Sequence, residues 1–307
     1  MIKFLCKLGF VYLVFTSTLL SLELMLLSKP NLYSHKQEYM DSHLDDISLF
    51  IIGQSHFEEG INPTYLRDDS IYNFAISGQG LIYTEQLARK YIPRMKNLKV
   101  VFVPFSYGMG YRVKNKTQGK FESTYRCMYL KYMHLHTNRL TDWMYWSEFA
   151  NSKLNIIERL YGKPDQCLCG LSYEKLDSLK GHIPLKLKGR IKEWETDHLP
   201  NEFDFTAPND DYYHQINTIA NLCQERGIRL ILISIPWWHS AHAKMTKRGI
   251  AAMQKVTDEL HKKYPCLEYH NYVFDKRFTA DDFNDATHLN EFGSSKFSLI
   301  LKNDLHL

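Results

Sequence analysis

The sequence predicts an α/β protein in which a parallel five-stranded sheet lies between two layers of helices. Short, almost wholly apolar segments alternate with longer segments of helical spacing, which is typical of parallel sheets covered on both faces. The chain has 307 residues, of which 44% are hydrophobic, and this is enough for one large core with an insertion. An apolar N-terminal segment and a loosely patterned middle segment lie outside the alternation.

The N-terminal segment has the pattern of a membrane-crossing helix. Lys3 and Lys7 precede an apolar run from Leu8 to Leu27, which Ser, Thr and Glu23 interrupt. About 20 residues of helix cross the hydrocarbon core of a bilayer, so the length favours an uncleaved signal-anchor. A cleaved signal peptide is the alternative. Because the lysines precede the run, the rest of the chain is expected outside the cytoplasm.

The chain therefore divides into three predicted parts. Residues 1–30 are the signal-anchor, residues 31–45 are a polar tether, and residues 46–307 are the α/β domain. Within the domain, residues 114–204 are expected to be an insertion between the third and fourth strands, helical at first and irregular later.

The alternation places the strands and helices of the domain. The strands are expected at residues 47–52, 71–76, 98–105, 228–235 and 267–273. The helices, with their capping residues, are expected at 83–94, 209–226, 243–263 and 290–301. In the insertion, helical spacing is found at 125–136 and 141–161.

Composition narrows the classes of partner and cofactor. A net charge of +4 from 38 basic and 34 acidic residues does not indicate a nucleic-acid partner. The 20 tyrosines fit either packing or a sugar-facing surface. The six cysteines follow no zinc spacing, and no metal or cofactor is expected. In an oxidising compartment, Cys127 could pair with Cys167 or Cys169, and Cys223 with Cys266.

Two short segments far apart in the sequence carry residues for nucleophilic chemistry. The first predicted strand stops at Gly53 and is followed by Ser55, and Asp285 and His288 precede the last predicted helix. A serine becomes a nucleophile when a base takes its proton and a third group orients that base. Ligands bind at the carboxyl ends of strands in parallel sheets, and Ser55 follows such an end. Other candidate positions also lie at predicted strand ends or in the loops that follow them, namely Gly78, Gly108, Trp237 and the loop 285–288.

These segments resemble the SGNH (GDSL-like) hydrolase superfamily. The resemblance lies in Gly53-x-Ser55, the block 73–78 (NFAISG) and Asp285-x-x-His288, and it covers about residues 47–111 and 205–301. It implies a flavodoxin-like strand arrangement. With the signal-anchor, the layout is also similar to extracytoplasmic proteins that acylate or deacylate cell-envelope polymers, such as the D-alanine transfer protein of teichoic acids. This likeness implies a location in a bacterial cell envelope or periplasm.

The resemblance implies a role for each residue. Ser55 would be the nucleophile, His288 its general base and Asp285 the group that orients the imidazole. The backbone N–H groups of Ser55 and Gly78 would stabilise the oxyanion.

Two positions depart from the family pattern. Gln54 stands where the family usually has Asp. The third block, Gly-x-Asn, is absent, and the corresponding residues include Ser106 and Gly108, either of which could replace the missing oxyanion donor.

Aromatic residues near the strand ends are candidates for a substrate wall. Tyr107, Trp237 and Trp238 could line a sugar-binding cleft, and ordinary packing is the alternative. His56 is adjacent to Ser55, and in an extended chain it would point away from the site as a structural residue.

The sequence thus predicts a serine-dependent esterase or O-acyltransferase acting on acyl esters of cell-surface carbohydrate through a Ser55 acyl-enzyme. The alternative is a catalytically silent SGNH-like domain that binds glycan or serves in envelope assembly. Expected partners are an acylated glycan or polysaccharide, the membrane through the N-terminal helix, and envelope-biosynthesis proteins.

Overall fold

The computed structural model describes residues 1–66, 70–113, 122–152, 156–161, 170–186 and 203–307, and these form two compact units. The helical unit comprises Met1–Tyr39 with Gly119–Tyr173, and the sheet unit comprises Met40–Gln118 with Glu174–Leu307. The first part of the predicted insertion therefore groups with the N-terminal segment, and its last part groups with the sheet.

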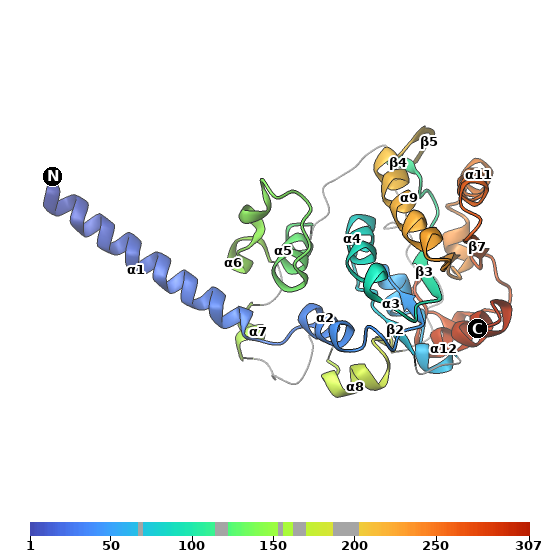
Figure 1. The fold of residues 1–307 in the computed structure, drawn as a ribbon, viewed down its shortest axis with the longest axis horizontal. Coiled ribbons are helices and arrows are strands. Elements are labelled where there is room, and N and C mark those ends of the chain that lie inside the picture. Colours follow the sequence, from blue (N-terminus) through green and yellow to red (C-terminus); the bar gives the residue numbers. More distant parts are fainter. Residues whose placement is uncertain (67–69, 114–121, 153–155, 162–169, 187–202) are drawn as a thin grey trace. The chain divides into compact units, whose positions relative to one another are not determined.

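The sheet unit is built on the parallel five-stranded sheet that the sequence predicts. Its strands are β1 (Leu49–Ile51), β2 (Ile71–Asn73), β3 (Val100–Pro104), β6 (Arg229–Ser234) and β7 (Leu267–Asn271). They lie in the order β2-β1-β3-β6-β7, and every neighbouring pair is parallel. Figure 1 labels β2, β3 and β7 of this sheet. Each strand is shorter than expected, although the apolar residues just beyond its ends are also buried.

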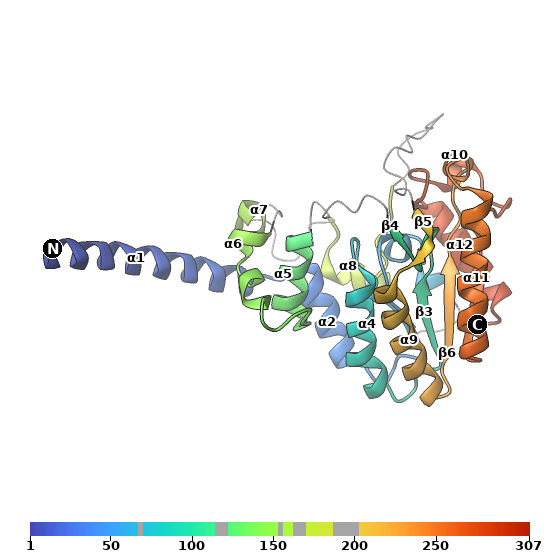
Figure 2. The ribbon, with the colours of Figure 1, turned by 90° about the horizontal axis from the view of Figure 1, so that it is seen from above.

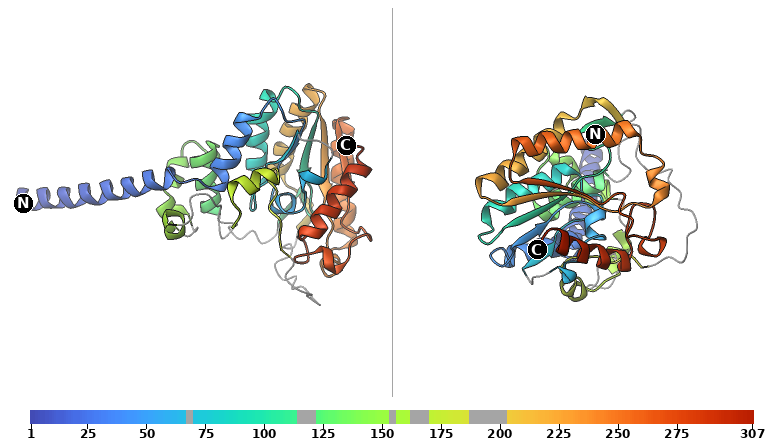
Figure 3. Two further views of the ribbon diagram at one scale, coloured as in Figure 1. Left: turned by 90° about the horizontal axis from the view of Figure 1, so that it is seen from below. Right: turned by 90° about the vertical axis from the view of Figure 1, so that its right-hand side faces the viewer.

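Helices cover both faces of this sheet. α4 (Leu81–Tyr91), α9 (Asp210–Glu225) and α11 (Lys247–Lys263) lie on one face, and α12 (Glu291–Asp304) lies on the other (Figures 2 and 3). The predicted caps are present, because the side chains of Asn209 and Asn290 accept hydrogen bonds from N–H groups in the first turns of α9 and α12.

Shorter elements complete the sheet unit. They are α3 (Ser55–Glu58), η1 (Pro63–Tyr65), η2 (Ile92–Arg94), α8 (Tyr173–Ser178), α10 (His239–His242) and η4 (Ala280–Asp282). The sequence did not predict the two-stranded antiparallel sheet of β4 (Tyr111–Val113) and β5 (Phe203–Pro208), which joins the two sides of the insertion.

The helical unit contains α1 (Ile2–Leu27), which is long and apolar enough to cross a membrane. A second helix, α2 (Leu32–Ser42), begins in this unit, ends in the sheet unit and occupies the segment expected to be a polar tether. The expected helix at 141–161 is three short pieces instead. The other elements of the unit are α5 (Glu122–Met133), η3 (Asp142–Tyr145), α6 (Glu148–Asn151) and α7 (Ile156–Tyr161).

Candidate active site

Ser55 is placed by a tight turn at the end of β1. Gly53 has φ +150°, and a Cβ there would lie 2.4 Å from the Pro104 side chain, so only glycine fits this turn. Its carbonyl accepts a hydrogen bond from Ile76 N–H at 3.0 Å, which joins the loops after β1 and β2. The chain then enters α3, whose first residue is Ser55.

The loop 285–288 is closed by its own hydrogen bonds. Asp285 Oδ1 accepts the N–H groups of Thr287 and His288 at 2.8 and 2.9 Å, which forms an Asx-turn. Asn284 N–H donates to the carbonyl of His288 at 2.8 Å, and Trp238 N–H donates to the carbonyl of Ala286 at 2.8 Å. The loop is therefore held from both sides before any ligand binds.

The structure brings Ser55, His288 and Asp285 together, and we call these three residues the triad. Ser55 Oγ lies 3.0 Å from His288 Nε2. His288 Nδ1 lies 2.9 and 3.0 Å from the two carboxylate oxygens of Asp285. An ionised carboxylate only accepts hydrogen bonds, so Nδ1 carries a proton and, in the neutral ring, Nε2 accepts the serine hydroxyl.

The same contacts shift the pKa values of the acid and the base. Burial acts to raise the pKa of Asp285, but hydrogen bonds from His288 and Thr287 and the charge of His288 lower it well below its usual value. Burial acts to lower the pKa of His288, and the hydrogen bond and charge of Asp285, with a contribution from Glu59, raise it above its usual value. Asp285 is therefore ionised at neutral pH, and it stabilises the protonated imidazole that forms when His288 takes the serine proton.

Glu59 is a second acid at this site, and sequence reasoning missed it. Glu59 Oε2 lies 4.0 Å from His288 Nε2, on the side of the ring that faces Ser55. Burial raises the pKa of Glu59 to about 7, while the charge of His288 acts in the opposite direction. The spacing in the sequence could have identified Glu59. It lies four residues after Ser55, and residues i and i+4 of a helix share a face.

The neighbouring Glu58 has a structural position. Its side chain is buried, and Oε2 accepts both the N–H and the hydroxyl of Ser77, at 2.7 and 2.6 Å. This contact ties α3 to the loop that carries Gly78. The Ser77 hydroxyl also lies 3.2 Å from Glu59 Oε1.

The expected oxyanion donors differ in their surroundings. The N–H groups of Ser55 and Gly78 make no hydrogen bond to another described residue, and Gly78 adopts φ +79°. The N–H of Ser106 donates to Met109 Sδ at 3.2 Å. Gly108 leaves room for the Phe203 ring, which a Cβ would meet at 2.4 Å. Two donors of the expected set, the N–H groups of Ser55 and Gly78, are therefore open, whereas the Ser106 N–H is engaged by Met109.

Tyr107 occupies a different place from the expected substrate wall. It is 6% exposed, its ring packs on Phe203 and Phe205, and its hydroxyl accepts the N–H of Thr246 at 3.0 Å. Because two rings of β5 pack on it, Tyr107 is a packing residue.

The two tryptophans and His56 lie nearer to the triad. Trp237 is buried, with its ring centre 6.2 Å from that of His56, and Trp238 is half-buried against Phe283. His56 does not point away from the site, because the chain is helical at this position; its ring centre lies 4.9 Å from that of His288. Burial and the charge of His288 lower the pKa of His56 to about 3, so its ring is neutral at neutral pH.

Cys223 and Cys266, considered above as a disulfide pair, are free thiols in the structure. Cys167 and Cys169 lie outside the described residues. Within the described ranges, no group of three or more His, Cys, Asp or Glu side chains could hold a metal ion.

Protein-family models and curated proteins identify no relative of the chain. No protein-family model matches the chain, and no curated protein matches it significantly. The functional argument therefore rests on the geometry of the site.

Proposed function

We propose that the protein is a serine-dependent esterase or O-acyltransferase that acts on acyl esters of cell-surface carbohydrate. The observation that carries the proposal is the continuous chain of contacts from Ser55 Oγ through His288 to Asp285, with distances of 3.0 and 2.9 Å. The two hydrogen-bonded steps match the arrangement that activates a serine.

The chemistry follows from these contacts. His288 Nε2 takes the hydroxyl proton as Ser55 Oγ attacks the ester carbonyl, and the carbonyl oxygen becomes an oxyanion near the N–H groups of Ser55 and Gly78. Collapse breaks the ester bond, His288 returns the proton to the departing alcohol, and the acyl group remains on Ser55. Water or an acceptor hydroxyl then attacks the acyl-enzyme, with His288 again taking and returning the proton.

The strand order supports an SGNH-like assignment. Numbered within the sheet alone, the order β2-β1-β3-β6-β7 is 2-1-3-4-5, which is the flavodoxin-like order. Ser55 follows the first of these strands and His288 lies beyond the last. This is the chain order of nucleophile and base expected from the resemblance.

The location and the substrate class extend the proposal. The helix α1, with Lys3 and Lys7 at its start, would anchor the protein with its site outside the cytoplasm. Esters of envelope carbohydrate are then the acyl substrates within reach, and the half-buried Trp238 beside the 285–288 loop supplies an aromatic surface for a sugar ring.

One observation favours a second function, a silent glycan-binding or envelope-assembly domain. The third oxyanion donor of the family pattern is absent, and the Ser106 N–H at that position is engaged by Met109. Loss of one such donor costs roughly 3–4 kcal/mol of transition-state stabilisation. We favour the enzyme because the triad geometry is complete without that donor.

The test is covalent labelling of the full chain with a fluorophosphonate or sulfonyl-fluoride probe. We expect labelling at Ser55 in the wild type and none in Ser55→Ala or His288→Ala, because the bond needs the hydroxyl and deprotonation needs the base. Ser295→Ala is the control, because it removes an exposed hydroxyl whose hydrogen bond is to the carbonyl of Glu291 within α12. A folded wild type that labels no faster than Ser55→Ala would favour the binding domain.

A further inference from the structure

The buried carboxylate of Glu23, near the end of α1, binds other residues of the helical unit. Glu23 Oε2 accepts Lys131 Nζ at 2.8 Å and the N–H of Glu148 at 3.2 Å. Glu23 Oε1 accepts the Ser147 hydroxyl at 2.5 Å and the N–H of Phe149 at 3.2 Å. An acid that would be costly in lipid therefore has four donors within the protein.

Lys131 joins Glu23 to a second buried acid. Its amino group lies 3.1 Å from Glu148 Oε2, and the side chains of Lys131 and Glu148 are fully buried. We call Glu23, Lys131 and Glu148 the ion cluster. A further contact supports the same junction, because the Tyr132 hydroxyl donates to the carbonyl of Leu26 at 3.2 Å.

This junction distinguishes a retained helix from a cleaved signal peptide. Cleavage after α1 would remove Glu23 and Leu26, and it would leave Lys131 with one of its two acids. Removing one partner from a buried ion pair is strongly destabilising. The last turns of α1 are therefore part of the folded helical unit.

The remainder of α1 is apolar and uncovered. Leu8, Phe15 and Leu20 are each more than half exposed, and Glu23 and Leu26 are the buried residues of the helix. A helix rises about 1.5 Å per residue, so the run from Leu8 to Leu27 is roughly 30 Å long, the thickness of a bilayer core. If that run spans the core, the turn that contains Glu23 lies at its outer boundary.

Residues that contact this turn must then lie at the same level, and one of them, Phe149, has an exposed apolar side chain close in sequence to others. Phe149, whose N–H binds Glu23, is 37% exposed. Trp146 is also 37% exposed, and its ring centre lies 4.8 Å from Lys131 Nζ. In the adjoining turn, Trp143 is 75% exposed and its indole N–H donates to the carbonyl of Leu140, itself 85% exposed.

We propose that this surface, made of Leu140, Trp143, Met144, Trp146 and Phe149, docks into the interfacial layer of the bilayer that α1 crosses. We call it the aromatic face. It is continuous with a membrane-crossing helix through the ion cluster, and tryptophan is enriched at the level of lipid headgroups, where its ring is buried and its N–H stays polar.

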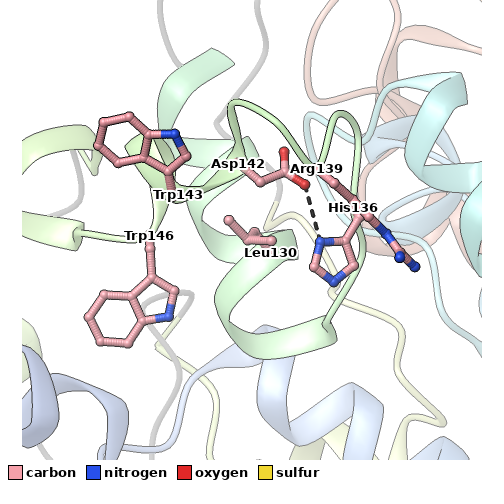
Figure 4. A pocket seen from close by; sticks show the side chains of 6 residues that line it. All are labelled: Leu130, His136, Arg139, Asp142, Trp143 and Trp146. Atoms are coloured by element: carbon pink, nitrogen blue, oxygen red, sulfur yellow. Dashed lines mark hydrogen bonds and ion pairs between the residues drawn. The ribbon is translucent and has the colours of Figure 1, made fainter.

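A pocket lined in part by the aromatic face also contains a cationic side chain. Figure 4 shows Trp143 and Trp146 on one side of this pocket and His136 and Arg139 on the other. Asp142 binds the His136 ring at 3.1 Å, whereas Arg139 forms no ion pair with any described residue. Arg139 is therefore available to a lipid phosphate.

The proposal does not depend on the serine chemistry, and it is tested with the full chain in phosphatidylcholine–phosphatidylglycerol vesicles. Lipids brominated near the top of the acyl chain quench tryptophans that enter the interface. We expect quenching in the wild type and loss of most of it in Trp143→Phe/Trp146→Phe, which keeps the apolar surface. The matched control, Trp237→Phe/Trp238→Phe, removes two tryptophans of the sheet unit and should keep the quenching.

Three results would overturn the proposal. One is a wild type that brominated lipid does not quench, and another is a Trp143→Phe/Trp146→Phe variant quenched as strongly as the wild type. A third is a dimer in vesicles that Trp143→Ser dissociates while lipid quenching is absent, which would assign the aromatic face to a second copy of the chain. A mature membrane protein whose first residue lies beyond Pro30 would overturn the retention of α1.

Discussion

The ion cluster of the helical unit and the triad of the sheet unit are both networks of charged side chains, but they differ in exposure. The side chains of Lys131 and Glu148 are fully buried, and that of Glu23 is 6% exposed. In the triad, by contrast, the side chains of His288 and Asp285 are 22% and 32% exposed.

This difference in exposure distinguishes a network that stabilises the fold from one that can react with a substrate. In the ion cluster, the surrounding donors and acceptors belong to the protein, so no group is left for a substrate. In the triad, the Ser55 hydroxyl reaches a base that also faces Glu59, and two backbone N–H groups nearby are open among the described residues. Buried charges that are fully paired maintain a fold, whereas partly exposed charges with shifted pKa values indicate a reactive site.

The largest expected effect is on the triad, from Asp285→Asn. A comparable change in a Ser-His-Asp triad lowers turnover about 10⁴-fold, because the imidazole is held in the wrong tautomer. We expect a similar fall in the rate of probe labelling at Ser55, with the fold intact by circular dichroism, since Asn Oδ1 still accepts the N–H groups of the turn.

The matched control for this change is Asp204→Asn. Asp204 Oδ1 accepts the N–H and the hydroxyl of Thr206 at 2.9 and 2.6 Å, so it forms a similar turn outside the triad. Its labelling rate should equal that of the wild type. If the two variants label equally, Asp285 has only a turn-forming role.

The next effect is on the ion cluster, from Lys131→Met. Removing the shared cation leaves two buried acids, and breaking a buried ion pair costs about 3–5 kcal/mol. Denaturant unfolding in detergent, followed by tryptophan fluorescence, should show this loss. The control is Lys255→Met, because Lys255 is 70% exposed and pairs with Glu259 at 3.9 Å; exposed pairs contribute roughly 0–1 kcal/mol.

The same variant sharpens the contrast between the two networks. All members of the triad belong to the sheet unit, and all members of the ion cluster belong to the helical unit. Folded Lys131→Met protein should therefore label at Ser55 at the wild-type rate. A large loss of labelling without unfolding would show that the ion cluster also serves the site.

A smaller effect is expected from Glu59→Gln, and it appears in the pH dependence. Labelling requires neutral His288, so the rate rises as pH increases through the pKa of His288. The charge of Glu59 contributes to raising that pKa. Removing the charge should lower it, so the acid limb of the rate profile moves to lower pH while the plateau at high pH is kept. An unchanged limb, as expected for the surface control Glu259→Gln, would exclude this coupling.

The smallest effect is expected from His56→Phe. The pKa of His56 is lowered to about 3, so its ring carries no charge in the range where labelling is measured. Phenylalanine keeps a ring beside His288 and Trp237. The labelling rate and its pH profile should match those of the wild type. If the variant lost the acid limb of the pH profile, proton transfer would be assigned to His56.

Local patterns in the sequence were sufficient for most of the fold. The five parallel strands were predicted because continuous apolar runs of that length are stable only in a sheet covered on both faces. The caps at Asn209 and Asn290 were readable because a helix N-terminus needs acceptors within a few residues. Ser55, Asp285 and His288 were found by residue type and chain order.

Tertiary structure alone decided which side chains meet across long sequence separations. In the sequence, Glu23 only interrupts an apolar run. In the structure it is the ion-pair partner of Lys131, which lies 108 residues later in the chain. Tyr107 was expected at the substrate wall. In the structure its ring packs against Phe203 and Phe205, and its hydroxyl accepts a hydrogen bond from the N–H of Thr246. Such partners are set by how the segments pack, and periodicity contains no information about them. Sequence pattern therefore determined the elements and the candidate chemistry, and packing determined the neighbours that make a charge structural or reactive.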